Sequence, residues 1–260
     1  MKNHLFLAFA LIILLFFSCA SFKKTELPTD YQINTVTGNY WIAAFSKISG
    51  LNYIITFPKD YETDTKEKYP LIIFLHSTAE IGDDINLVMQ NPAGEGNGLA
   101  PYALKKDNFR YITISPLCPS KAYWPLLNNR LNLLIKDITQ KYYIDNKRIY
   151  LTGVSMGGMG VWSLAMSFPK WFAAIAPISG GIYFPPMIEN TKAIKNIPTW
   201  AFHDLNDPDI PISKEQGTIF RLQKKNKSVR YTISNNGLHY IHEKIYDSDE
   251  LFDWFLSVNK

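Results

Sequence analysis

At 260 residues, the chain is long enough for one α/β domain with a large core, and it has no second apolar block or Pro/Ser-rich linker that would indicate two domains. Its formal net charge of +4 is small and is spread along the sequence, which argues against a nucleic-acid-binding protein. The densest basic run, Arg221 to Lys227, has the spacing of a solvated helix face.

The N-terminal residues are typical of an export signal. Lys2 supplies a short basic start, and the apolar run from Leu5 to Phe17 is too short to span a bilayer comfortably. Small residues then flank Cys19, and this arrangement resembles a bacterial lipoprotein box. The pattern predicts a signal peptide over residues 1–18, and the resemblance implies that Cys19 carries lipid.

This interpretation has consequences for the rest of the chain. If Cys19 is lipidated, Cys118 is the one remaining thiol, and no intramolecular disulfide can form. Residues 19–40 are then a polar tether, residues 41–260 are the folded domain, and the protein is anchored in the bacterial cell envelope on its periplasmic or outer face. An ordinary secreted protein and a membrane protein with a single anchor are the alternatives.

Beyond the tether, strand-like and helix-like segments alternate, which predicts an α/β fold with a mostly parallel sheet and helices on both faces. β-branched and aromatic runs predict strands at Leu51–Phe57, Leu71–Leu75, Tyr111–Ser115, Arg148–Thr152, Phe172–Ala176, Thr199–His203 and Val229–Ile233. Helical periodicity predicts helices at Leu126–Tyr142, Met156–Phe168, Ser213–Lys225 and Asp247–Val258. In such sheets, chemistry collects at the carboxyl ends of the strands.

One strand-to-helix junction carries the pattern G-x-S-x-G, from Gly153 to Gly157. Glycines on either side of Ser155 let the backbone approach its neighbours, and the serine hydroxyl is held in the open by a strained turn. The turn also starts a helix, so the N–H of Met156 is free to bind a developing oxyanion. The junction therefore predicts a serine nucleophile.

A serine hydroxyl needs a base to remove its proton, and the base needs an acid to orient it. In folds with this junction, the acid and then the histidine follow the serine along the chain. Candidates occur in that order after two later strands: Asp204, Asp207 and Asp209 in "HDLNDPDIP", then His239 and His242 in "SNNGLHYIHEK".

Six segments together resemble the secreted esterases of the α/β-hydrolase superfamily, and more narrowly the predicted-peptidase group that includes polyhydroxybutyrate-depolymerase-like and feruloyl-esterase-like enzymes. The segments are "LHSTAEIGDD", "NPAGEGNG", "SPLCPS…W", "GVSMGGMGVWSLAMSFPKWFAAIAPISGG", "HDLNDPDIP" and "GLHYIHEKIYDSDELFDWFL". The resemblance implies that Asp207 is the acid, with Asp204 and Asp209 as alternatives. It likewise implies that His239 is the base, with His242 as the alternative.

The resemblance also has a departure, in the loop after His76. The family has glycine where this chain has Ser77, whose side chain could narrow the oxyanion hole or require another backbone conformation. The second oxyanion donor implied here is the N–H of Thr78. Glu95 and Trp124 match the family's substrate-cleft segments, and plain core packing is the alternative for Trp124.

The predicted activity is acyl transfer through an acyl-enzyme intermediate, with an ester of a small molecule or polysaccharide as substrate, such as an acetyl or feruloyl ester. No metal or cofactor is expected, because no histidine or cysteine cluster has ligand spacing. Two alternatives stay open: a serine peptidase with the same residues, and a surface lipoprotein that binds glycans or partners without hydrolysis. The sequence assigns no oligomeric state.

Overall fold

The computed structural model describes residues 32–33, 37–62, 67–89, 98–182 and 190–260. Within these residues, nine strands form one sheet in the order β1-β2-β3-β5-β4-β6-β7-β8-β9. The strands are β1 (Gln32–Ile33), β2 (Tyr40–Ser46), β3 (Leu51–Phe57), β4 (Tyr69–Leu75), β5 (Ile112–Pro116), β6 (Ile144–Val154), β7 (Ala174–Ile178), β8 (Thr199–Asp204) and β9 (Val229–Ser234). Strands β4 to β9 are parallel to one another. Strands β1 to β3 are antiparallel and form one side of the sheet, where β3 pairs with β5. This confirms the predicted fold class.

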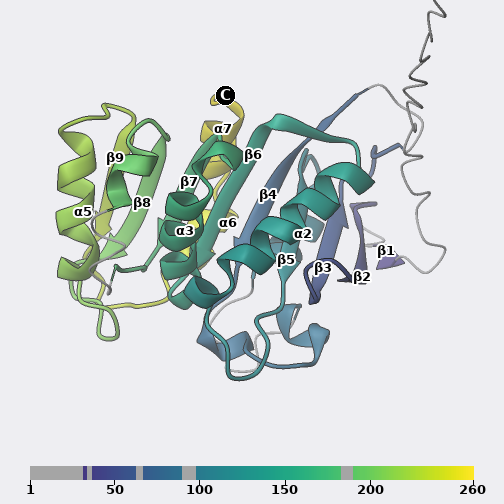
Figure 1. Ribbon diagram of the computed structural model, residues 1–260, viewed down its shortest axis with the longest axis horizontal. Coiled ribbons are helices and arrows are strands. Elements are labelled where there is room, and N and C mark those ends of the chain that lie inside the picture. The colour runs from purple at the N-terminus through teal and green to yellow at the C-terminus, as the bar shows by residue number, and fades with distance from the viewer. Residues whose placement is uncertain (1–31, 34–36, 63–66, 90–97, 183–189) are drawn as a thin grey trace, which may run out of the picture.

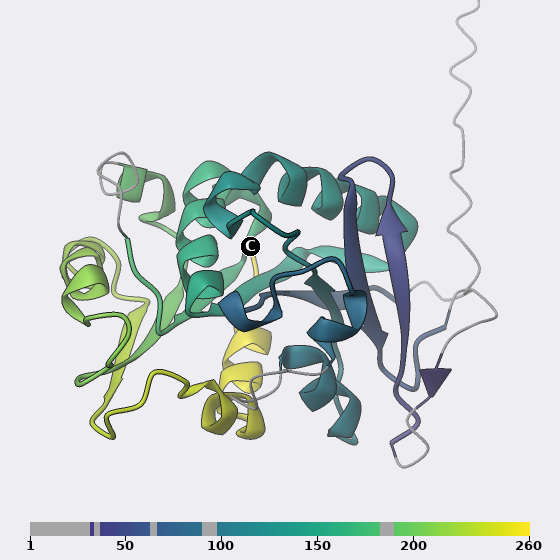
Figure 2. The ribbon, with the colours of Figure 1, turned by 90° about the horizontal axis from the view of Figure 1, so that it is seen from below.

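Helices cover both faces of the sheet, as Figures 1 and 2 show. They are α1 (Leu99–Lys105), α2 (Asn128–Lys141), α3 (Met156–Ser167), α5 (Ser213–Gln223), α6 (His242–Asp247) and α7 (Glu250–Leu256). Short 3₁₀ helices are η1 (Thr78–Glu80), η2 (Ile85–Val88), η3 (Trp124–Leu126), η4 (Pro169–Trp171) and η5 (Asn190–Ile194). Helices α2 and α3 lie on one face, and α1, α6 and α7 lie on the other (Figure 2).

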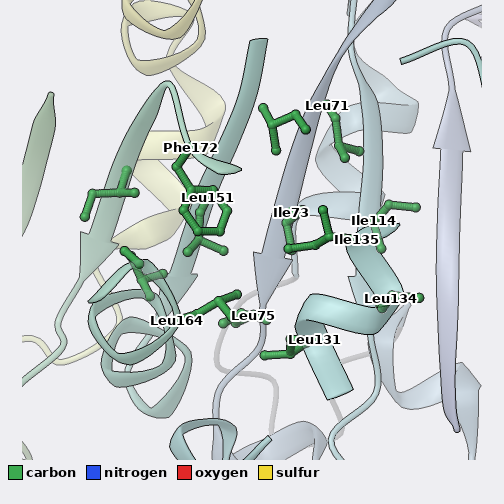
Figure 3. Close-up of a cluster of buried hydrophobic side chains, with 14 of the residues drawn as sticks. Leu71, Ile73, Leu75, Ile114, Leu131, Leu134, Ile135, Leu151, Leu164 and Phe172 are labelled. Atoms are coloured by element: carbon green, nitrogen blue, oxygen red, sulfur yellow. The ribbon is translucent and has the colours of Figure 1, made fainter. Parts of the chain in front are cut away.

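Strand β4 illustrates how the sequence builds the two layers. Its residues from Pro70 to Leu75 are buried, because both faces of a central parallel strand are covered. Leu71, Ile73 and Leu75 enter the layer with α2 and α3, and Figure 3 shows them in one cluster with Leu131, Leu134 and Ile135 of α2. The alternate residues of β4 enter the opposite layer. Alternate residues of this one strand therefore pack into the two hydrophobic layers on opposite faces of the sheet.

The domain begins earlier than the predicted boundary at residue 41. Strand β1 pairs with β2 within the segment expected to be tether. Thr37 and Asn39 are buried, and their side chains donate hydrogen bonds to the carbonyls of Leu104 and Ala103 at the end of α1. Polar residues read as a solvated linker thus satisfy the last carbonyls of a helix, which have no intrahelical donors.

The part of the chain expected to be the signal peptide, with Cys19, lies outside the described residues. Among the helices that are described, none is long and apolar enough to cross a membrane. The basic run at the end of α5 is solvated as expected, since Arg221, Lys224 and Lys225 are exposed while Leu222 is buried.

Candidate active site

Ser155 occupies the sharp turn between β6 and α3. Its backbone has φ 57° and ψ −118°, in the left-handed half of conformational space that residues with a side chain rarely adopt. The turn is held from outside, because the N–H of Ser155 donates to the carbonyl of Ile178 at the end of β7. Such strain persists only where surrounding structure enforces it, and it is frequent at active sites.

The glycines around Ser155 allow neighbouring strands to come close enough to hold the turn in this conformation. A Cβ atom on Gly157 would lie 1.8 Å from the carbonyl oxygen of Leu75, and one on Gly158 would lie 2.7 Å from that of Ile178. Neither backbone oxygen can move aside without breaking the sheet. The start of α3 therefore packs directly on the ends of β4 and β7, as the glycine pattern predicts.

Ser155, His239 and Asp207 form one continuous hydrogen-bonded chain. The Nδ1 atom of His239 lies 2.8 Å and 3.0 Å from the two carboxylate oxygens of Asp207, and its Nε2 atom lies 2.8 Å from Oγ of Ser155. A carboxylate only accepts, so the ring proton sits on Nδ1 and the Nε2 lone pair faces the serine hydroxyl. The structure thus brings together the three residues that the sequence predicted.

Asp207 is oriented by its own loop. Its side chain is buried, and Oδ1 accepts hydrogen bonds from the N–H groups of Asp209 and Ile210 at 2.9 Å and 2.8 Å. The side chain of Asp209 is 61% exposed, and its carboxylate is 4.0 Å from Nε2 of His239, on the side away from Asp207. Asp209 is therefore not the group that orients the imidazole.

Asp204, the other alternative, serves the loop that carries His239. Its carboxylate accepts from the hydroxyl of Ser234 at 2.6 Å and from the N–H groups of Asn236 and Gly237 at 2.8 Å and 3.1 Å. Burial alone would raise the pKa of Asp204, but these hydrogen bonds, with one from the Asn206 amide, outweigh it and lower the pKa from 3.8 to about 2.

A stability test follows from Asp204. Because its pKa is lower in the folded protein than in the unfolded chain, its stabilisation is complete above pH 4 and is lost as the pH falls toward 2. We expect Asp204→Asn to reduce the free energy of unfolding at pH 7 by about 2 kcal/mol, since a side-chain amide cannot accept at both atoms. In urea denaturation, the gap from the wild type should narrow between pH 4 and pH 2. A gap of constant size would contradict this role, and Asp209→Asn is the exposed control.

His242 is a core residue and not a second candidate base. Its ring is buried and packs edge-on against Tyr240 and Tyr246, with centroids 5.9 Å and 6.0 Å away. The hydroxyl of Tyr246 lies 3.0 Å from that of Thr152 on β6. His242 therefore belongs to the layer between α6 and the sheet.

Sequence reasoning missed Ser179, which follows β7. Its backbone φ is 46°, its N–H donates to the carbonyl of Phe202, and its hydroxyl donates to the carbonyl of His239 at 2.6 Å. The hydroxyl thus holds the backbone of the candidate base. The sequence feature that could have indicated Ser179 is the run of small residues in "ISGG", which follows a predicted strand and lies within a segment that resembles the family.

The two backbone amides predicted to bind the oxyanion are those of Met156 and Thr78. Met156 is the first residue of α3 and Thr78 is the first residue of η1, so neither amide has an intrahelical acceptor. The close approach of Gly157 to the carbonyls of Leu75 and His76 places the start of α3 against the loop that leads to Thr78. Both predicted oxyanion donors therefore sit on adjoining segments.

The departure at Ser77 is accommodated inside that loop. Ser77 is buried in an ordinary extended conformation with φ −76°. Its hydroxyl donates to the carboxylate of Glu80 at 2.7 Å and accepts from the N–H of Ala79 at 3.2 Å. The side chain therefore caps η1, and the backbone at Ser77 needs no unusual conformation.

His76 and Trp124 support the same loop. The Nε2 atom of His76 accepts from the N–H of Cys118, and Nδ1 donates to the carbonyl of Ser77. Burial lowers the pKa of His76 to about 4, so its ring is neutral at pH 7. Trp124 has no exposed surface, and its indole N–H donates to the carbonyl of His76 at 2.9 Å. The enclosed ring agrees with the core-packing alternative for Trp124. Glu95 lies outside the described residues.

The geometry agrees with the comparisons. A solved thermostable esterase is 28% identical to this chain and superposes with a TM-score of 0.71, over 86% of this chain and 64% of that one. The chain has the α/β-hydrolase fold. Residues 126–248 match the family model described as Phospholipase/Carboxylesterase, a span that includes Ser155, Asp207 and His239.

Curated relatives are similar to shorter stretches of this chain. A bifunctional acetylxylan esterase/xylanase from Neocallimastix patriciarum is 33% identical over 86 residues, which are 33% of this chain and 12% of that protein. A probable feruloyl esterase C from Aspergillus terreus is 28% identical over 173 residues, 64% of this chain and 58% of that protein. The chain thus spans less than two thirds of the length of these relatives.

Proposed function

We propose that this α/β-hydrolase is a serine carboxylesterase with Ser155, His239 and Asp207 as its catalytic residues. The observation that carries the proposal is the unbroken hydrogen-bonded chain from the carboxylate of Asp207 through the imidazole to the hydroxyl on the strained turn. This arrangement points a lone pair at a nucleophile whose conformation is enforced, which is the requirement for acyl transfer.

The reaction has two halves. In the first, Oγ of Ser155 attacks the ester carbonyl while Nε2 of His239 takes the hydroxyl proton, and the amides of Met156 and Thr78 bind the oxyanion. The imidazolium then gives its proton to the departing alcohol, which leaves an acyl-serine. In the second half, water attacks the acyl group while His239 takes its proton. His239 then returns that proton to Oγ of Ser155 as the acyl–oxygen bond breaks and the acid is released. Asp207 holds the ring and stabilises its charged form throughout.

For the substrate, we propose acetyl or feruloyl esters on polysaccharide. Support comes from the relatives, which are named as an acetylxylan esterase and a feruloyl esterase, and from no contact within this structure. The experiment is hydrolysis of p-nitrophenyl acetate, p-nitrophenyl butyrate, methyl ferulate and an aminoacyl-p-nitroanilide by the wild type and by Ser155→Ala. Turnover of the esters that depends on Ser155 is expected. Turnover of the anilide alone would favour a peptidase.

A fluorophosphonate probe separates hydrolysis from binding alone. Such probes react with an activated serine, so Ser155 should be labelled in the wild type and not in Asp207→Asn or Ser155→Ala. A folded wild type that neither reacts with the probe nor turns over any of the four substrates would favour the binding-protein alternative.

We further propose that the mature protein is held in the cell envelope by lipid on Cys19. The support is the sequence around Cys19, and the test is metabolic labelling with an alkyne fatty acid. Label is expected on the wild type and on Cys118→Ala, and not on Cys19→Ala. Equal labelling of all three would remove the proposal.

A further inference from the structure

The reaction leaves unused a buried pair of ionisable side chains next to the acid loop. Glu215 on α5 and His203 on β8 both have no exposed surface. Burying an ionisable group is costly unless another group compensates it. A buried pair of this kind is therefore expected to have a role, and its contacts with neighbouring residues indicate which role.

Hydrogen-bond directions define the state of the pair. Nε2 of His203 lies 2.9 Å from the carbonyl oxygen of Ile210, and Nδ1 lies 2.9 Å from Oε2 of Glu215. A carbonyl only accepts, so Nε2 must carry a proton. A second proton then lies between Nδ1 and the Glu215 oxygen, and the pair is neutral overall whichever atom holds that proton.

The pair connects the helix of the nucleophile with the loop of the acid. On one side, the indole N–H of Trp162 in α3 donates to Oε1 of Glu215 at 2.8 Å. On the other side, Ile210 is held at both ends: its carbonyl accepts from His203, and its N–H donates to Oδ1 of Asp207. An unbroken chain of contacts thus runs from α3 through α5 and β8 to Asp207.

We propose that Glu215 and His203 are positioning residues that hold the acid loop in register with helix α3, with an imidazolium that offsets part of the charge of Asp207. This inference rests on the proposed function. The supporting contact is the distance of 3.4 Å between Nε2 of His203 and Oδ2 of Asp207, the oxygen that lies 2.8 Å from Nδ1 of His239.

The charges around His203 favour its protonated form. Burial alone would lower its pKa, but the hydrogen bond to Glu215, the Glu215 charge and the nearby Asp207 outweigh burial and raise it. The remaining ionisable groups that face this cluster are His239 and Asp209, and Tyr231 from β9, whose pKa burial and the Glu215 charge raise. Tyr231 is therefore neutral at pH 7, and among the described residues the partners of Asp207 that can carry a positive charge are His203 and His239.

Glu215→Gln tests the inference because it conserves shape while it removes the charge. The side-chain carbonyl of glutamine can still accept from Trp162, and its NH₂ can donate to Nδ1, so His203 becomes neutral with its Nε2 proton retained. Without the imidazolium, Asp207 acts more strongly on the ring of His239 and favours its charged form. In a plot of kcat/KM against pH, the midpoint on the acid side should then rise by about half a pH unit. We also expect kcat to fall about fivefold with KM unchanged.

Trp162→Phe tests the connection to α3, and Trp171→Phe is its matched control. Each removes an indole N–H that donates at 2.8 Å to a side-chain oxygen, of Glu215 in the first case and of Asn132 in the second. We expect a fall in kcat of about threefold for Trp162→Phe and no change for Trp171→Phe. Equal effects of the two variants would overturn the positioning role.

An NMR titration of the His239 ring, without substrate, separates this inference from the esterase proposal. The midpoint should rise in Glu215→Gln relative to the wild type, whatever the protein hydrolyses. A lower melting temperature with an unmoved midpoint and an unmoved pH–rate profile would show a merely structural role and overturn the inference. In that case, ester turnover that depends on Ser155 would leave the proposed function standing.

Discussion

Ser155→Ala should lower kcat for ester hydrolysis by a factor of about 10⁵–10⁶ and leave the fold intact. The loss is this large because the variant has no nucleophile to form the acyl-enzyme, while the oxyanion amides and the substrate site remain. Alanine has a Cβ as serine does, so the strain at φ 57° is unchanged and the melting temperature should stay near that of the wild type. Steady-state hydrolysis of p-nitrophenyl acetate and thermal unfolding measure the two quantities.

Ser155→Gly is the matched variant, since it also removes the hydroxyl but relaxes the backbone. Glycine adopts positive φ without a Cβ clash, so we expect this variant to be inactive and about 1 kcal/mol more stable than Ser155→Ala. Both variants lack the nucleophile, so the difference between them isolates the conformational cost of the turn. A glycine variant no more stable than the alanine variant would mean that the turn stores no strain.

Asp207→Asn should reduce kcat about 10⁴-fold with a small change in KM. An asparagine NH₂ facing Nδ1 of His239 favours the ring tautomer with its proton on Nε2, and the serine then has no acceptor for its proton. The aspartate must accept from the ring while it also accepts from the amides of Asp209 and Ile210, and asparagine has one oxygen for all of these donors. Kinetics with methyl ferulate and with p-nitrophenyl acetate measure the effect.

The control is Asp209→Asn, because Asp209 is an exposed carboxylate two residues away. Its backbone amide, which Asp207 needs, is kept in the variant. We expect a change in kcat of less than about threefold. If Asp209→Asn were the more damaging substitution, the assignment of the acid would have to move to Asp209.

The fold could be predicted wherever a segment's own pattern decides its environment. Strand β3 agrees with its predicted range at both ends, and β4 begins two residues before its predicted start. Strand β2 was missed because it lies next to the edge of the sheet, where it is half-buried and its pattern is weak. Its pairing with β3 identifies it. Helix α1 was missed because it is short and has Pro101 in its first turn, which is compatible with a helix but does not predict one.

The sequence by itself determined the turn at Ser155, because Gly157 and Gly158 meet backbone oxygens that no side chain could tolerate. It also determined the order of serine, acid and histidine. Only the tertiary structure decided which aspartate and which histidine face each other, since His239 is 84 residues from Ser155 and 32 from Asp207, and each lies within a few residues of rivals of the same type. The contacts of each residue distinguish the candidates. Asp204 accepts hydrogen bonds from loop amides, whereas Asp207 accepts one from the imidazole of His239. His242 packs against two tyrosines. The pairing of Glu215 with His203 likewise forms only when α5 packs onto β8, because a glutamate 12 residues after a histidine does not by itself predict a contact between them.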